Sequence, residues 1–303
     1  MTAATPTRRL VGTPTRRRNE RLVKGVLLLA AILSIAISAG IVLSLIFEAA
    51  TFLGSIELSQ LWTDGWFPRR GMFDIPTLLI GSLLVTGIAM LIAAPVGLLS
   101  AIYLAEYASP QLRGTVKPVL EVLAGVPSVV LGFFALTIIN PYFIQNLVPS
   151  ADGFNLAAAA VAVGILTVPL VATISEDSMR AVPIALREAS YGLGARRVTT
   201  ATRVVVPAAI SGIVAAMILG ISRAVGETMV VAIAAGMQPN LTFDPRQPAA
   251  TITAYIVQVS LGDLPHGSIG YQSIFAAGLV LMIITLIFNI IGFSLTRRFR
   301  EAY

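Results

Sequence analysis

The chain has 303 residues, of which 56% are hydrophobic and only 12% are charged, and it carries a formal net charge of +6. Soluble domains carry about 25% charged residues, so half that share cannot cover the surface of a globular protein of this length. Together with a mean hydropathy of +0.86, this composition excludes a soluble enzyme, a disordered chain and a secreted disulfide scaffold, and leaves a polytopic membrane protein. The absence of cysteine and the single histidine, His266, exclude thiol catalysis, disulfides and a cysteine- or histidine-rich metal site.

Six apolar stretches are long enough to cross a bilayer as helices, because a span needs about 20 apolar residues for a hydrocarbon layer of about 30 Å. They run over residues 25–47, 78–104, 119–139, 156–175, 210–236 and 272–295. Proline removes a backbone donor and kinks a helix, so Pro127 and Pro169 are expected to interrupt the third and fourth stretches. The predicted fold class is an all-α membrane protein with about six transmembrane helices.

The N-terminal residues 1–24 are predicted to be a basic cytoplasmic tail, followed by a single transmembrane domain over residues 25–303. Residues 1–20 are rich in Thr, Pro and Arg and show no hydrophobic period, so we expect a mobile segment. The basic start also fits a signal peptide. However, the apolar run from Val26 to Phe47 exceeds the usual h-region of about 7–15 residues and no small-x-small cleavage site follows, so we predict a retained anchor.

The distribution of Lys and Arg predicts the orientation in the membrane. Seventeen of these residues lie in the N-terminus, the C-terminus and the loops after the second and fourth stretches, whereas only Arg69, Arg70 and Arg246 lie on the other side. By the positive-inside rule, both termini are cytoplasmic. The same split explains the net charge without nucleic acid, because the basic face meets anionic lipid headgroups. We therefore expect a bacterial-type cytoplasmic membrane protein.

Two external loops follow from this topology. In the loop over residues 49–77, Trp62, Trp66 and Phe67 suit either an interfacial aromatic belt or contact with a partner. In the loop over residues 237–271, a short amphipathic helix is predicted because apolar residues recur at helical spacing from Ile252 to Val259. His266 lies between proline and glycine in that loop and is read as a solvated residue.

No catalytic, cofactor or metal site is evident. The chain's two lysines, Lys24 and Lys117, are not preceded by glycine, so the G-x-x-x-x-G-K-[ST] cradle for nucleotide phosphates is absent. No G-x-S-x-G nucleophile elbow is present either. The chain is therefore not expected to be an enzyme or to carry a cofactor.

The most informative segment is the cytoplasmic loop over residues 176–208. Pro183 suits the first turn of a helix, and a short helix is predicted over residues 184–191. Gly192 and Gly194 offer a sharp break, and a second short helical stretch ends at Pro207. We expect a helix–turn–helix that lies on the cytoplasmic face.

This loop resembles the EAA motif of ABC-importer permeases, which reads Glu-Ala-Ala, three residues, Gly, nine residues, Ile-x-Leu-Pro. Glu188, Ala189, Gly194 and Pro207 match in register, and Ser190 replaces an alanine. In that family the loop docks in a groove of the ATPase subunit. The resemblance therefore implies a type I importer architecture. The alternative interpretation of the loop is an ordinary connector at the membrane interface. The candidate coupling residues are Arg187, Glu188, Ala189, Ser190, Gly194 and Pro207.

Further segments are similar to the PstC-type permease of phosphate importers. The segment Gly220 to Val231, with Gly226-Glu227-Thr228-Met229, resembles a Gly-Arg-Ala-x-Gly-Glu-Thr-Met motif of that subunit. The segments 61–66, 102–107 and 126–132 are also similar. The related PstA-type subunit tends to follow Gly-Glu-Thr with alanine and proline, so Met229 favours the PstC type.

The fifth stretch contains two charges, Arg223 and Glu227, whose i, i+4 spacing puts them on one helical face. Each charge at a span centre costs about 2.5–3.5 kcal/mol, so the pair is expected to point into the bundle. It forms either a structural ion pair or part of the anion path or its gate. An i, i+4 row of small residues from Gly212 to Gly236 also predicts that this stretch is central and touches at least two helices.

The function that the resemblance implies is the permease subunit of an ATP-driven importer of inorganic phosphate. Its implied partners are a PstA-type second permease, a pair of ATPase subunits and an external phosphate-binding protein. A permease for another oxyanion, such as molybdate or sulfate, is the nearest alternative. An ion-driven secondary transporter and a membrane-anchored scaffold are more distant ones.

Overall fold

The computed structural model describes residues 14–298, apart from the side chains of residues 14–17 and 63–64. The chain divides between Phe47 and Glu48 into two units. The described part of the first unit belongs to one helix, α1 (Pro14–Ser55). This helix is long enough and apolar enough to cross a membrane. The helix begins at Pro14, before the predicted start of the first span at residue 25. Residues 1–13 of the predicted tail lie outside the described part.

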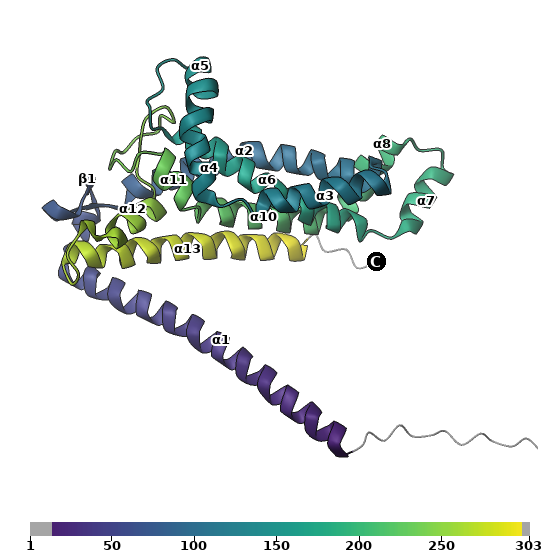
Figure 1. Ribbon diagram of the computed structural model, residues 1–303, viewed down its shortest axis with the longest axis horizontal. Coiled ribbons are helices and arrows are strands. Elements are labelled where there is room, and N and C mark those ends of the chain that lie inside the picture. The colour runs from purple at the N-terminus through teal and green to yellow at the C-terminus, as the bar shows by residue number, and fades with distance from the viewer. Residues whose placement is uncertain (1–13, 299–303) are drawn as a thin grey trace, which may run out of the picture. The chain divides into compact units, whose positions relative to one another are not determined.

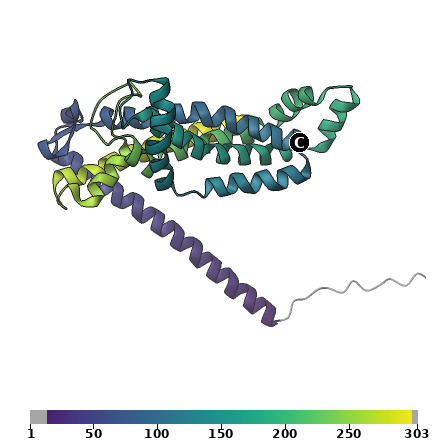
Figure 2. The same cartoon turned by 45° about the horizontal axis from the view of Figure 1, so that its top comes forward.

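Four long helices of the second unit run side by side (Figures 1 and 2). They are α2 (Ile75–Ile102), α6 (Leu156–Arg180), α10 (Ile210–Val225) and α13 (Ile269–Arg298). A small hairpin and α12 (Ile252–Gln258) lie at one end of the four, which we call the hairpin end. The short helices α7 (Ile184–Gly192) and α8 (Arg197–Thr200) lie at the other end, which we call the loop end.

The predicted second, fourth and sixth stretches are confirmed as α2, α6 and α13, and Pro169 lies inside α6 without breaking it. The third is displaced. A separate amphipathic helix, α3 (Pro110–Ala124), ends before Gly125. The apolar crossing then runs through α4 (Ser128–Phe134), η4 (Ala135–Ile144) and α5 (Gln145–Leu147). Pro127 directly precedes α4 and interrupts no helix. Proline is tolerated at the start of a helix, since the N–H that it lacks has no partner there.

The fifth stretch is not one continuous helix, so the prediction of a span over 210–236 is wrong. After α8, the chain continues through η5 (Ala201–Val205) and α9 (Val206–Ala208), and it bends by 72° before α10. Helix α10 ends at Val225, and α11 (Met229–Ala234) starts after a break that contains Gly226. The described residues hold five helices that could span a membrane, or six if the bent pair is one span.

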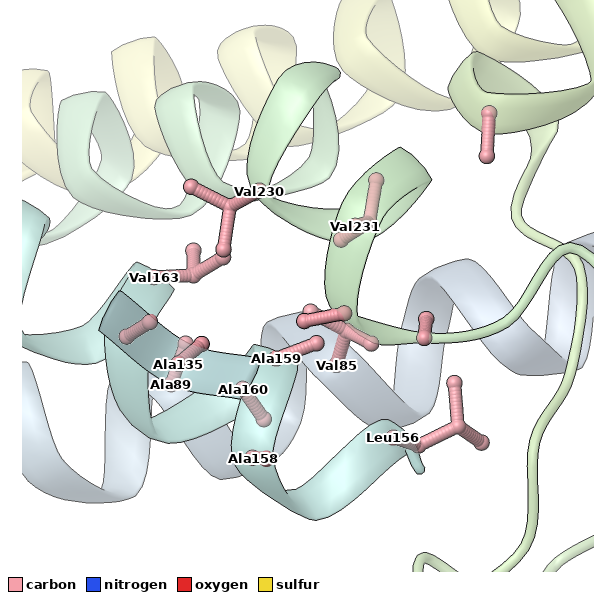
Figure 3. Close-up of a cluster of buried hydrophobic side chains, with 14 of the residues drawn as sticks. Val85, Ala89, Ala135, Leu156, Ala158, Ala159, Ala160, Val163, Val230 and Val231 are labelled. Carbon is pink, nitrogen blue, oxygen red and sulfur yellow. The ribbon is translucent and has the colours of Figure 1, made fainter. Parts of the chain in front are cut away.

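The core of the four-helix region is built from small side chains. Val85 and Ala89 of α2 meet Ala159 and Val163 of α6, and Val230 of α11 closes the cluster (Figure 3). Small residues allow the backbones of membrane helices to approach closely. This close approach makes α2 and α6 one packed pair.

Helix α10 also packs through small residues, as predicted. A Cβ on Gly220 would lie 3.0 Å from Val171 of α6 and 3.4 Å from Met90 of α2. On another side, Ile218 of α10 fits against Gly292 of α13. Helix α10 is therefore central and touches three helices, although its row of small residues ends at the break after Val225.

The hairpin end contains two short strands that the all-helical prediction did not include, β1 (Trp62–Phe67) and β2 (Met72–Asp74). The short helices η1 (Leu58–Leu61) and η2 (Pro68–Arg70) flank β1. Trp66 is buried, with its ring 5.7 Å from that of Phe73 and 5.1 Å from that of Tyr255. It therefore belongs to the core and not to an aromatic belt, whereas Trp62 and Phe67 are exposed.

The predicted amphipathic helix of the second external loop is confirmed as α12, which continues into η6 (Val259–Asp263). The preceding segment crosses α2, where the backbone N–H of Ile252 donates to Ser82 Oγ at 2.9 Å. At the same crossing a Cβ on Gly81 would overlap the carbonyl oxygen of Ala250.

We expect Gly81→Ala to destabilise the folded chain by about 1–3 kcal/mol, because overpacking at a backbone contact forces the segment away from α2. Gly87→Ala is the matched control, since it lies in the same helix with nothing within 4 Å of its Cβ position. Thermal unfolding in detergent measures both. Equal melting temperatures for the two variants would show that the contact with Ala250 contributes nothing.

The segment before α12 is held by Arg246, whose guanidinium donates to Asp244 at 2.6 Å and to Ser150 Oγ at 3.1 Å. The hydrogen bonds from Arg246 lower the pKa of Asp244 to about 2. A lowered carboxylate pKa stabilises the folded segment above its unfolded value of about 4, and this contribution is lost as the pH falls towards 2.

We therefore expect Asp244→Asn to make this loop more sensitive to proteolysis, with a difference from the unchanged chain that stays constant from pH 5 to 8. Below pH 4 the difference should shrink steadily, because Asp244 takes up a proton and, with a pKa of about 2, is half neutral at pH 2. Limited proteolysis of both forms, compared at each pH with one protease active in acid and another active from pH 5 to 8, measures this. A difference at pH 2 as large as that at pH 7 would contradict the ion-pair explanation.

Candidate functional site

Helix α7 at the loop end confirms the predicted helix–turn–helix. It starts after Pro183 and ends at Gly192. Gly194 then adopts φ +77°, its N–H donates to Tyr191 O at 2.9 Å, and Ala195 N donates to Ser190 O at 3.1 Å. Nothing lies within 4 Å of a Cβ at position 194, so the left-handed backbone alone requires glycine here. The first residues of the predicted loop, from residue 176 to Arg180, belong to α6.

Ser190 connects the two halves of the loop. Its hydroxyl lies 2.8 Å from the hydroxyl of Thr200 in α8, and both side chains are buried. The serine at the motif's alanine position therefore ties α7 to α8. Pro207 lies in the first turn of α9, where its missing N–H costs nothing.

The remaining motif residues face outward. Glu188 and Ala189 are exposed, and they lie among large apolar side chains that are also exposed. Ile184 is 70% exposed and Leu193 is 90% exposed. Exposed apolar residues of this size on one loop are typical of a contact surface for another protein.

Arg187 points inward and makes four hydrogen bonds. Its Nε and Nη2 donate to Glu106 Oε1 at 3.2 and 3.1 Å. Its Nη1 donates to Val182 O at 2.6 Å, and Nη2 also donates to Met179 O at 2.8 Å. The arginine thus holds α7 against the end of α6 and against η3 (Tyr103–Tyr107), the π-helical turn that follows α2.

A second buried carboxylate, Glu176, lies in the last turns of α6. Lys117 Nζ of α3 contacts its Oε2 at 2.8 Å, and Arg113 and Arg180 approach its Oε1 to 3.7 Å. Burial lowers the pKa of Lys117, but the hydrogen bonds to Asp177 and Glu176 outweigh it and leave that pKa raised, so the lysine stays charged. This cluster fixes α3 to α6 and does not include α7.

The two charges predicted on one face of the fifth span are not paired. Glu227 lies beyond the end of α10, where its Oε1 accepts from Val230 N at 3.4 Å at the start of α11. Arg223 lies on α10 with an exposed side chain and has no hydrogen-bond or ion-pair partner within residues 14–298. The structural ion pair is therefore wrong for this structure, and the break after Val225 is the reason.

Sequence reasoning assigned no role to Glu106, Glu176 or Asn289. Asn289 is the one amide in the last two thirds of α13, and its Oδ1 accepts from Ser222 Oγ on α10 at 3.4 Å. Glu106 and Asn289 are isolated polar residues in or beside an apolar run, whereas Glu176 stands in a polar run with Ser175 and Asp177. An isolated polar residue marks a costly and therefore informative position in a membrane protein, and this signal was available for Glu106 and Asn289 only.

The chain matches a family model described as "Binding-protein-dependent transport system inner membrane component" over residues 93–301. It is 33% identical over 287 residues to "Probable ABC transporter permease protein YqgH" of Bacillus subtilis (strain 168), a match that covers 90% of each chain. It is 31% identical over 290 residues to "Phosphate transport system permease protein PstC" of Mesorhizobium japonicum, which covers 88% of this chain and 87% of that protein.

A solved structure of a bacterial alginate ABC transporter, in complex with a periplasmic protein bound to an alginate pentasaccharide, contains a chain of similar fold. The TM-score is 0.67, with 15% identity, over 94% of this chain and 96% of that one. At this identity the likeness concerns the fold alone.

Proposed function

The chain belongs to the family of binding-protein-dependent transport system inner membrane components, and on that premise we propose that it is the PstC-type permease subunit of an ATP-driven importer of inorganic phosphate. It is a multi-pass membrane protein and not itself an enzyme. ATP hydrolysis belongs to a separate subunit pair, and a PstA-type permease completes the path. An external phosphate-binding protein delivers the substrate.

The observation that carries this proposal is the built geometry of the loop end. Gly194, Ser190 and Arg187 hold a short helix in one conformation, while Ile184, Glu188 and their exposed neighbours remain uncovered. A rigid loop with an apolar outer surface is suited to receive force from another protein. We assign this surface as the ATPase-docking element, with the loop end on the cytoplasmic side and the hairpin end outside. The excess of Lys and Arg in the two terminal segments supports a cytoplasmic location of both termini.

The substrate assignment is supported by the unpartnered Arg223. Arg223 is an exposed cation in the last turn of the apolar helix α10, and no carboxylate within the described residues pairs with it. Charged residues on membrane helices are costly and usually functional. Guanidinium groups bind oxyanions through two parallel hydrogen bonds. Among the possible oxyanions we choose phosphate, because a relative with 31% identity is named a phosphate transport system permease.

The test is reconstitution of the chain with its second permease, the ATPase subunits and the phosphate-binding protein into proteoliposomes. We expect uptake of labelled phosphate that requires ATP on the loop-end side and the binding protein on the hairpin-end side. Uptake by this chain alone without ATP would instead identify a secondary transporter. Transport of molybdate or sulfate but not phosphate would retain the importer and replace the substrate.

A further inference from the structure

Glu106 is a buried carboxylate that the proposed function does not use. It lies in η3, and its side chain is only 4% exposed. In the same π-helical turn, the carbonyl group of Leu104 accepts a hydrogen bond from Arg113 of α3 at 2.9 Å. Burying a carboxylate is costly unless it is paired, so the position demands a cation.

The cation is Arg187 of α7, which lies 81 positions along the chain from Glu106. Its Nε and Nη2 donate to one carboxylate oxygen of Glu106. Nη2 also donates to the carbonyl group of Met179 in the last turn of α6, and Nη1 donates to that of Val182 just beyond α6. Arg187 is itself only 17% exposed. The planar guanidinium therefore joins three elements, α7, α6 and η3, in one fixed geometry.

Two mechanical routes lead out of α7. One runs through Arg187 to the packed pair α2 and α6, where a Cβ on Gly97 would lie 2.8 Å from Val171. The other runs through Ser190 and Thr200 to α8, and from there across a 72° bend to α10. The first route ends in a tightly packed helix pair, whereas the second passes through a bend.

We propose that Glu106 is a positioning residue for the coupling loop: its bond to Arg187 makes α7 move as one body with α2 and α6 when the ATPase subunits close. This inference rests on the proposed function, because it assumes that α7 is the docking element. Glu106 touches neither substrate nor nucleotide in this mechanism. It sets how much of the movement of α7 reaches the membrane-spanning helices.

The test compares Glu106→Gln and Glu106→Leu in the reconstituted transporter. Glutamine keeps the size and one acceptor oxygen but loses the negative charge, so its hydrogen bonds to the charged arginine are weaker. Leucine removes the acceptor. We expect basal ATP hydrolysis within about twofold of the unchanged complex, while phosphate moved per ATP falls about threefold for glutamine and about tenfold for leucine. Exchanging the two residues is not a useful rescue, because a glutamate at position 187 would face two carbonyl oxygens.

The matched control is Glu176→Gln, which neutralises a buried carboxylate of the same region that does not contact α7. It should lower the amount of inserted protein without changing phosphate moved per ATP. An equal loss of coupling in this control would overturn the inference. So would an unchanged ratio in Glu106→Leu, since a pair that only stabilises the fold alters the amount of complex and not its coupling.

A second measurement needs no partner subunit. The chain has no cysteine, so spin labels can be placed cleanly at Leu193→Cys in the loop and Leu99→Cys on α2, both of which are exposed. We expect a narrow distance distribution that broadens in Glu106→Leu and not in Glu176→Gln. Unchanged distributions would contradict the positioning role. Absence of ATP-driven uptake in the unchanged complex would instead defeat the proposed function, and the label distances would still be readable.

Discussion

Valine at position 194 should leave the subunit inserted in the membrane but weaken docking of the ATPase subunits, with phosphate uptake reduced at least about fivefold. Gly194 adopts φ +77°, a conformation that costs a β-branched residue about 1–3 kcal/mol. The two backbone bonds that end α7 depend on it. If only the native turn docks, the apparent affinity for the ATPase falls by the same free energy, which is about 5- to 150-fold.

Gly192→Ala is the control for this prediction. Both glycines have open space at the Cβ position, but only Gly194 has a positive φ. The alanine variant should therefore assemble and transport normally. Co-purification of the ATPase subunits and uptake per inserted permease measure both variants. Normal uptake by Gly194→Val would show that the turn does not set the docking geometry.

The loop end was predictable from sequence because its signals are local. Proline before a helix and glycine after it act over a few residues, and they located α7 to within one residue of its observed end at Gly192. The short helix α12 was predictable for the same reason, since its apolar residues recur within two turns. Long apolar stretches separated by polar and basic segments likewise predicted an all-helical membrane protein.

The break in the fifth span was not predictable from hydropathy, because the apolar composition continues through Gly226 into α11. The break depends on tertiary contacts, among them the hydroxyl of Thr253 in α12, which donates to Glu227 O at 2.6 Å. Long-range pairs such as Glu106 with Arg187 also leave no local pattern. The hairpin at β1 was missed because its strands are short and pair through a turn without an alternating apolar signal.

These differences change what is expected of the charges in the fifth span. A structural ion pair predicts that removing both charges restores function, because the desolvation cost disappears with them. In the structure Arg223 and Glu227 are not paired, and Glu227 instead accepts from the backbone at the start of α11. Neutralising both residues should therefore not rescue the loss of one.

Arg223→Leu should insert at least as well as the unchanged chain, since it removes a charge from an apolar membrane helix and leaves no carboxylate without its partner. Phosphate uptake should fall to near background, because the positive charge that attracts the oxyanion is gone. Arg223→Lys should retain part of the uptake, since a lysine keeps the charge but cannot offer two parallel hydrogen bonds. Glu227→Gln keeps the acceptor for Val230 N and should affect uptake less than Arg223→Leu does.

The decisive variant combines Arg223→Leu with Glu227→Gln, and its uptake is measured with labelled phosphate in a strain without other phosphate carriers, normalised to inserted protein. Under the pathway role the double variant inserts well and transports no better than Arg223→Leu alone. Recovery to near-normal uptake would refute that role, because it would mean that the arginine serves only to neutralise the glutamate in some state of the transport cycle. The single arginine on α10 would then be a structural charge, and the oxyanion would have to be recognised elsewhere along the path.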